Sequence, residues 1–321
     1  MTFAATTDVA SEVLGAPPKG SRFLRRLARR PVAIIAILVI LTIYLAGILA
    51  PVLPIDGFND TDFEHRFAGP SWDHPLGTDS LGRDLLSRAI WSAQTTVIIS
   101  AASVLTGALA LGVTMGLISG YFGGKVDSVI MRVAEVFASV PTILLLLIIT
   151  ATLKDKVELW FEDIENALGI NWLVSSGAPS YFLVFGARAI FSWVGIARLV
   201  RSQVLALREN AYVTAAEAAG ASTRRFLFRH LLPNLTNLLV VSLTLGLGAA
   251  AAAEVGLTFL GIGVQAPHPS FGVMIFEGSG ASNVRAHVHV ILVPAVFLGL
   301  LVISFNLLGD QLTDILSPRR R

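Results

Sequence analysis

Few stretches of this sequence combine residue types at spacings that could do chemistry. The run SGYFGGKV at 119–126 approaches a phosphate loop, but a serine replaces the first glycine and a valine replaces the Mg²⁺-binding hydroxyl residue. Gly278-Ser279-Gly280 offers a serine without the spacing or the base of a serine hydrolase. The chain has no cysteine, which excludes thiol chemistry and disulfides. No catalytic site is therefore expected, and any ATP hydrolysis must come from another subunit.

Three histidines and one carboxylate remain. His287 and His289 would diverge by roughly 200° on a helix, which is poor geometry for a shared ligand. We expect them, and His268 in the preceding outer loop, to be interfacial side chains, and we expect no metal site and no cofactor. Glu254 differs because it lies inside a long apolar segment. Such a carboxylate faces a bundle interior or a solute pathway, or bonds to a neighbouring helix.

The elements that position these residues are membrane-spanning helices. Hydrophobic residues make up 54% of the 321 residues and charged residues only 14%, which is incompatible with a soluble domain. Apolar segments near or above the roughly 20 residues needed to cross a bilayer lie at 31–53, 95–119, 128–153, 180–200, 234–264 and 288–308. The predicted fold class is an all-α membrane protein with six transmembrane helices. We expect kinks at prolines and close packing at glycines, namely Pro141, Pro294, Gly107, Gly112, Gly116, Gly246 and Gly248.

Lysine and arginine indicate the orientation. They concentrate before the first span, between the fourth and fifth spans and at the C-terminus, so the positive-inside rule predicts that both termini are cytoplasmic. The net charge of +2 implies no nucleic-acid partner. The expected domains are a cytoplasmic segment 1–30, a first transmembrane helix 31–53, an outer loop 54–94, a five-helix core 95–309 with a cytoplasmic loop 201–233, and a cytoplasmic tail 310–321.

That cytoplasmic loop has the features of a docking element. Its alanines favour a smooth helix, Gly220 permits a left-handed turn and Ser222 can cap a second helix. Pro233 is expected to close that second helix at the membrane. An ordinary amphipathic connecting loop is the alternative interpretation.

The sequence TAAEAAG at 214–220 resembles the EAA loop of bacterial ABC-importer permeases, which has an acidic residue, two alanines, a glycine and a later Leu-Pro pair. The alignment puts Thr214 at the acidic position, and Glu217 lies one helical turn later. Whether Glu217 takes over the acidic role stays open. The resemblance implies that the loop couples to an ATPase through Thr214, Ala215, Ala216, Glu217, Gly220, Ala221, Ser222, Leu232 and Pro233.

The outer loop contains HPLGTDSLGRDLLSRAI at 74–90. Apolar residues at helical spacing predict a short helix over 81–90 that lies at the outer interface, with Asp79 or Ser80 as its cap. Two ion-pairing arginines are expected to meet two aspartates, namely Arg83 and Arg88 with Asp79 and Asp84.

The pattern GTDxxGRDxxSR in this loop is typical of the dipeptide, oligopeptide and nickel subfamily of those permeases. LTFLGIGVQAPHPSFGVM at 257–274, FNLLGDQLTDILSP at 305–318 and RRLARRP before the first span extend the resemblance over nearly the whole chain. Together they resemble the C-type subunit rather than its B-type partner. Departures are Thr214, Ala266 where a second proline is usual, and an outer insert 154–177, which could be an amphipathic interface helix.

This resemblance implies a type I importer fold in the bacterial inner membrane. The implied partners are a homologous B-type permease in a heterodimer, two cytoplasmic ATPase subunits, an extracytoplasmic solute-binding protein and membrane lipid. The residues implied to face the binding protein are Gly77, Thr78, Asp79, Gly82, Arg83 and Asp84. The predicted function is ATP-driven uptake of peptides or similar small solutes. The alternatives are an ion-coupled secondary transporter that uses Glu254, or an importer of the same family for nickel or haem.

Overall fold

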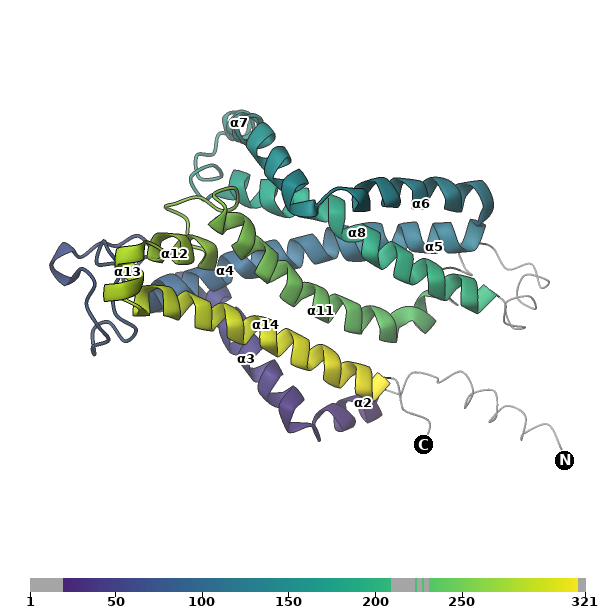
Figure 1. The fold of residues 1–321 in the computed structure, drawn as a ribbon, viewed down its shortest axis with the longest axis horizontal. Coiled ribbons are helices and arrows are strands. Elements are labelled where there is room, and N and C mark those ends of the chain that lie inside the picture. The colour runs from purple at the N-terminus through teal and green to yellow at the C-terminus, as the bar shows by residue number, and fades with distance from the viewer. Residues whose placement is uncertain (1–19, 209–222, 224–226, 228–230, 317–321) are drawn as a thin grey trace.

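The structure, a computed structural model, describes residues 20–208, 223, 227 and 231–316. Within these residues the regular elements are helices, and an isolated bridge pairs Thr78 with Asp84. Figure 1 shows their arrangement. The all-α prediction is confirmed. The elements are α2 Gly20–Leu27, α3 Pro31–Leu49, η1 Ala50–Val52, η2 Phe63–His65, α4 Leu85–Ser103, η3 Val104–Gly112, α5 Val113–Phe122, α6 Gly124–Ser139, α7 Thr142–Leu168, α8 Ala178–Arg208, α11 Leu232–Phe259, α12 Phe271–Gly278, α13 Ala281–Ala286 and α14 His289–Leu316.

The described helices include five or six candidate crossings of the membrane. Five continuous runs are long and apolar enough to cross, and α6 with α7 forms a sixth candidate that is bent by 85°. Arg30 at the start of α3 donates to Gln311 at 3.0 Å and to Asp314 at 3.1 Å near the end of α14. The first and last spans therefore meet at one end of the bundle (Figure 1). An even number of crossings is needed to bring them there, so the bent pair supplies the sixth.

The bend between α6 and α7 follows from Pro141. Proline has no N–H and disfavours helical backbone at the residue before it, and Val140 is extended, with φ −105° and ψ 137°. The predicted kink is thus a complete break. Beyond it, α7 continues through the first part of the predicted insert to Leu168, leaves at a steep angle to α6 (Figure 1) and packs on the start of α8 through Phe161 and Phe182. It ends at Gly169, which is left-handed at φ 67°.

The short, separate helix predicted at 81–90 is instead the beginning of a membrane-spanning helix. Residues from Leu85 onward are the first turns of α4, which starts ten residues before the predicted second span. Asp84 is its cap, because the Asp84 carboxylate accepts from the N–H of Ser87 at 2.7 Å. The predicted caps, Asp79 and Ser80, were therefore wrong. Leu85 is fully buried, so this stretch is core rather than interface.

Small residues allow the central helices to pack closely. The run from η3 to α5 faces α8, where a Cβ added to Gly116 would lie 2.6 Å from Cβ of Val200. Gly107 and Gly112 make contacts of the same kind. The prediction fails at Gly246, whose added Cβ would meet only Val104, at 3.9 Å. Close packing therefore joins the second and fourth spans along one face.

Candidate functional site

A cluster of four charged side chains, of which three are buried and Glu277 is a quarter exposed, joins the outer loop to α4 and α12. Oδ2 of Asp79 accepts from Nε of Arg83 at 2.7 Å and from Nη1 of Arg88 at 2.5 Å. Oδ1 of Asp79 accepts from the N–H groups of Leu81 and Arg83, at 2.8 and 3.1 Å. Both guanidiniums also reach Oε2 of Glu277, at 2.7 and 2.8 Å. Two cations thus balance two carboxylates, which is how buried charges are tolerated.

The observed ion pairs differ from the expected ones, because Glu277 takes the place of Asp84 as the second carboxylate. Neither arginine pairs with Asp84, because its carboxylate caps α4 and lies 3.2 Å from Nδ1 of His74. Glu277 was not among the predicted site residues. It is 194 residues from Arg83 in sequence, and its only sequence signal is a carboxylate in the otherwise apolar FGVMIFEG of α12.

The six residues predicted to face a binding protein lie inside the outer loop. All of them are buried, namely Gly77, Thr78, Asp79, Gly82, Arg83 and Asp84. Gly82 has φ 77°, and a Cβ there would lie 1.6 Å from the carbonyl oxygen of Asp62, so only glycine fits. These residues shape the loop from within. Its exposed surface includes two large apolar side chains, Phe63 and Trp72.

Glu254 lies between helices and is fully buried. Its carboxylate accepts from the hydroxyl of Thr258 at 2.9 Å and from that of Thr96, on α4, at 3.4 Å. The Thr258 hydroxyl in turn accepts from the N–H of Val264 at 3.1 Å. Of the predicted alternatives, this geometry supports a hydrogen bond to a neighbouring helix. Glu254 therefore braces α11 against α4 and against the turn that follows α11.

The run that approaches a phosphate loop is the turn between α5 and α6. Gly123 and Gly124 have φ of 63° and 52°, which lets the chain reverse between the two helices. The Ser119 hydroxyl donates to Asp127, and the Asp127 carboxylate also accepts from Arg201 of α8. This turn ties the second, third and fourth spans together.

Most of the predicted coupling residues, Thr214 to Ser222, lie outside the described residues. Leu232 and Pro233 are described and form the first turn of α11, where the fixed φ of proline suits a helix start. Pro233 thus lies at the start of a span, and most of the helix expected before it lies outside the described residues. Before it, Leu227 and Leu231 are buried in a cluster with Val200 and Val204 of α8.

The outer histidines are held by the outer loop. His287 stacks on Phe67 with ring centroids 4.1 Å apart, and Nε2 of His289 lies 3.3 Å from the carbonyl oxygen of Thr78. Burial lowers the pKa of His268. The role expected for them at the membrane interface stays a prediction.

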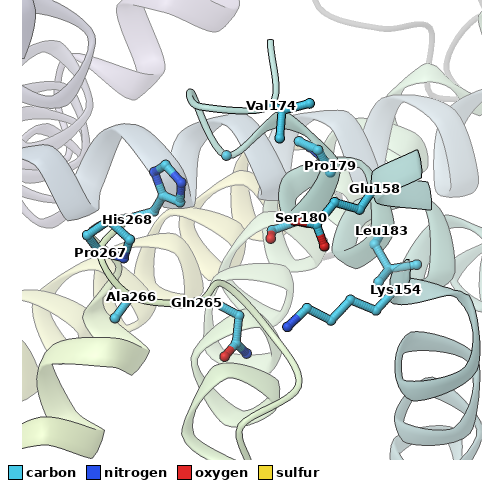
Figure 2. A pocket seen from close by; sticks show the side chains of 11 residues that line it. Lys154, Glu158, Val174, Pro179, Ser180, Leu183, Gln265, Ala266, Pro267 and His268 are labelled. Carbon is cyan, nitrogen blue, oxygen red and sulfur yellow. The ribbon is translucent and has the colours of Figure 1, made fainter. Parts of the chain in front are cut away.

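A pocket of about 280 Å³ opens between α7, the start of α8 and the loop after α11. Figure 2 shows Lys154 extending toward Gln265, with Pro267 and His268 on the opposite wall. Glu158 and Ser180 also line it. The pocket joins the insert 154–177 to the loop after α11.

These features define a class of protein, namely a multi-pass membrane protein with a braced loop at 54–84 and close-packed central helices. Residues 112–321 match the family described as binding-protein-dependent transport system inner membrane component. Residues 20–70 match the N-terminal transmembrane domain of oligopeptide transport permease C. The chain belongs to the binding-protein-dependent transport system inner membrane component family.

Curated relatives extend the similarity over nearly the whole chain. The dipeptide transport system permease protein DppC of Alkalihalophilus pseudofirmus is 34% identical over 92% of this chain and 89% of its own length. The glutathione transport system permease protein GsiD of Pectobacterium atrosepticum is 35% identical over 92% and 90%. The oligopeptide transport system permease protein OppC of Mycobacterium bovis is 33% identical over 93% and 94%. The resemblance to a C-type permease is confirmed, and the chain is a permease component of an ABC importer in the inner membrane rather than an enzyme.

Proposed function

We propose that the chain is the C-type half of an ATP-driven importer for peptides. The observation that carries this proposal is the match of residues 20–70 to the N-terminal domain of oligopeptide permease C. The curated relatives given above are named for dipeptides, oligopeptides and glutathione, all of which contain peptide bonds and charged ends. Peptides are therefore favoured over nickel and haem.

The proposed complex pairs this chain with a B-type permease, two cytoplasmic ATPases and an extracytoplasmic binding protein. Both termini would be cytoplasmic, as would the loop 201–233, which would dock on an ATPase. The binding protein would meet the exposed tip of the outer loop at Phe63 and Trp72, while the buried charges around Asp79 hold that tip in shape. Large apolar and aromatic side chains are common anchors of protein interfaces, and these two are exposed in the chain.

Reconstitution tests this proposal directly. The two permeases and two ATPases are placed in proteoliposomes, the binding protein is added outside, and uptake of a labelled dipeptide is measured with and without ATP inside. We expect uptake that needs ATP and the binding protein and that resists an uncoupler. Uptake that ignores ATP and collapses with the uncoupler would overturn the importer mechanism. Uptake of Ni²⁺ or haem in place of peptide would overturn only the solute class.

A further inference from the structure

Three potential metal ligands meet on the outer loop, apart from the buried charges around Asp79. One ligand atom from each of Asp62, His65 and His74 lies within 4.8 Å of the other two. Oδ2 of Asp62 is 2.7 Å from Nδ1 of His65, and the two imidazole centroids are 5.9 Å apart. A tetrahedral Zn²⁺ site holds its ligand atoms about 3.4 Å apart. Small rotations of the half-exposed side chains of Asp62 and His65 reach that spacing.

The surroundings of the three side chains are those of a metal site. Oδ1 of Asp84 lies 3.2 Å from Nδ1 of His74, which leaves Nε2 of His74 as the nitrogen that can bind an ion. A carboxylate on the second nitrogen of a ligating histidine fixes its tautomer and raises its basicity. The backbone is held as well, since the Thr78 hydroxyl donates to the carbonyl of His65 and the His74 N–H donates to Ser71 at 3.0 Å.

Acidic residues also make the site attractive to a cation. Glu64 and Asp73 are exposed next to the ligand residues in sequence, and Asp84 faces His74. Their charges add to that of Asp62. Aspartate and two imidazoles are ligands that Zn²⁺ prefers, and three protein ligands leave a fourth position for water.

We propose that Asp62, His65 and His74 bind one divalent transition-metal ion of the zinc type. The ion takes the place of the hydrogen bond between Asp62 and His65: neutral His65 binds it through Nδ1 with its one proton on Nε2, and where His65 starts as an imidazolium the second proton leaves to solvent. The ion joins the helical turn Phe63–His65 to the segment that precedes Gly77, across a loop with little regular structure. The ion thus staples the part of the loop that carries Phe63 and Trp72. The site is independent of the solute that the protein transports.

Metal titration of the purified chain tests the site without any transport assay. The full chain, carrying a histidine-free affinity tag, is dialysed free of metal in detergent and titrated with Zn²⁺, and with Co²⁺ as a coloured probe. We expect one ion per chain and the absorption of tetrahedral Co²⁺. His65→Ala and His74→Ala should each weaken binding at least about tenfold, and Asp84→Asn, which keeps a capping side chain, about 10- to 100-fold.

His268→Ala is the matched control, because it removes an outer histidine that lies outside the cluster, and its affinity should equal that of the wild type. Zn²⁺ should also slow trypsin cleavage after exposed Arg66 but not after Lys154. Thermal unfolding without metal shows whether each variant is folded. The proposal is overturned if the wild type binds no stoichiometric ion, or if His65→Ala and His74→Ala bind it as tightly as His268→Ala does.

Discussion

At the scale of single residues, Asp79 is the centre of the charge cluster in the outer loop, because its carboxylate accepts four hydrogen bonds. Asp79→Asn keeps the shape but removes a charge that faces two buried guanidiniums. Breaking a buried ion pair on one side costs about 3–5 kcal/mol, so we expect the free energy of unfolding to fall by that order. This free energy is measured by chemical denaturation followed by tryptophan fluorescence. Trp91 reports on the loop, because the ring centroids of Trp91 and of Phe58 in the loop are 5.5 Å apart.

The control for that variant is Asp73→Asn, which removes an exposed carboxylate of the same loop. Exposed charges contribute about 0–1 kcal/mol, so this variant should unfold like the wild type. Equal stability of the two variants would contradict a central role for Asp79 in the charge cluster.

Two variants of Glu254 distinguish a structural role, in which it holds helices together, from a direct role in transport. Glu254→Gln keeps an oxygen that can accept from Thr258, so ATP-driven uptake should persist. Glu254→Ala leaves the hydroxyls of Thr96 and Thr258 without their acceptor and should lower the free energy of unfolding by about 1–3 kcal/mol. The measurements are uptake in proteoliposomes and unfolding in detergent. A Gln variant that unfolds normally but has lost uptake would instead assign the carboxylate to the solute pathway.

The residues found by sequence reasoning are those whose partners are close in sequence. Arg83 lies four residues from Asp79, and Arg88 lies nine residues from it, so their pairing was predictable. Glu277 was not, because it lies on α12 and reaches the two arginines only when the helices pack. The contact between Asp84 and His74 depends on how the loop folds back on itself. His74 likewise reaches Asp62 and His65 only through that fold of the loop, so the cluster of the three was not predicted.

At the scale of elements, glycines decide how closely helices approach. Gly116 faces Val200 and Ala197 of α8 at less than 3 Å from an added Cβ, whereas Gly299 of α14 has nothing within 4 Å. Alanine is the better helix former by about 1 kcal/mol. Gly299→Ala should therefore be neutral or stabilising, while overpacking at Gly116→Ala should destabilise by about 1–3 kcal/mol. Thermal unfolding of the two variants tests this difference in stability. Equal melting temperatures would argue against close contact of α5 with α8.

The presence of the long helices was predictable from their apolar runs. Where they end and how far they bend depend on tertiary contacts, which the sequence does not show. The six crossings and the break at Pro141 follow from composition and from proline chemistry. The size of that break does not, because the 85° between α6 and α7 is set by packing beyond Pro141. The early start of α4 was also hidden, since two other residues, Asp79 and Ser80, looked equally able to cap a helix.

At the scale of the whole molecule, the segment 201–233 is anchored where it leaves and re-enters the helices. Arg208 at the end of α8 donates to the carbonyl of Gly120 at 3.2 Å. At the other end, Leu231 is buried with Val204 of α8 and Leu235 of α11. A force on the segment would therefore reach α5, α8 and α11 together. These are helices on both sides of the close contact at Gly116.

This anchoring gives the last prediction, which concerns Gly220 in the proposed coupling loop. The sequence predicts a left-handed turn at Gly220, where a β-branched residue would be strained by about 1–2 kcal/mol, which corresponds to roughly a tenfold change in an equilibrium. In the reconstituted complex, Gly220→Val should therefore keep ATP hydrolysis and lower the amount of peptide taken up per ATP by roughly that factor. Gly69→Val, in the outer loop with nothing within 4 Å of an added Cβ, is the control and should transport normally. An unchanged ratio of uptake to hydrolysis in Gly220→Val, at normal expression, would exclude this turn as the point where ATPase motion enters the membrane helices.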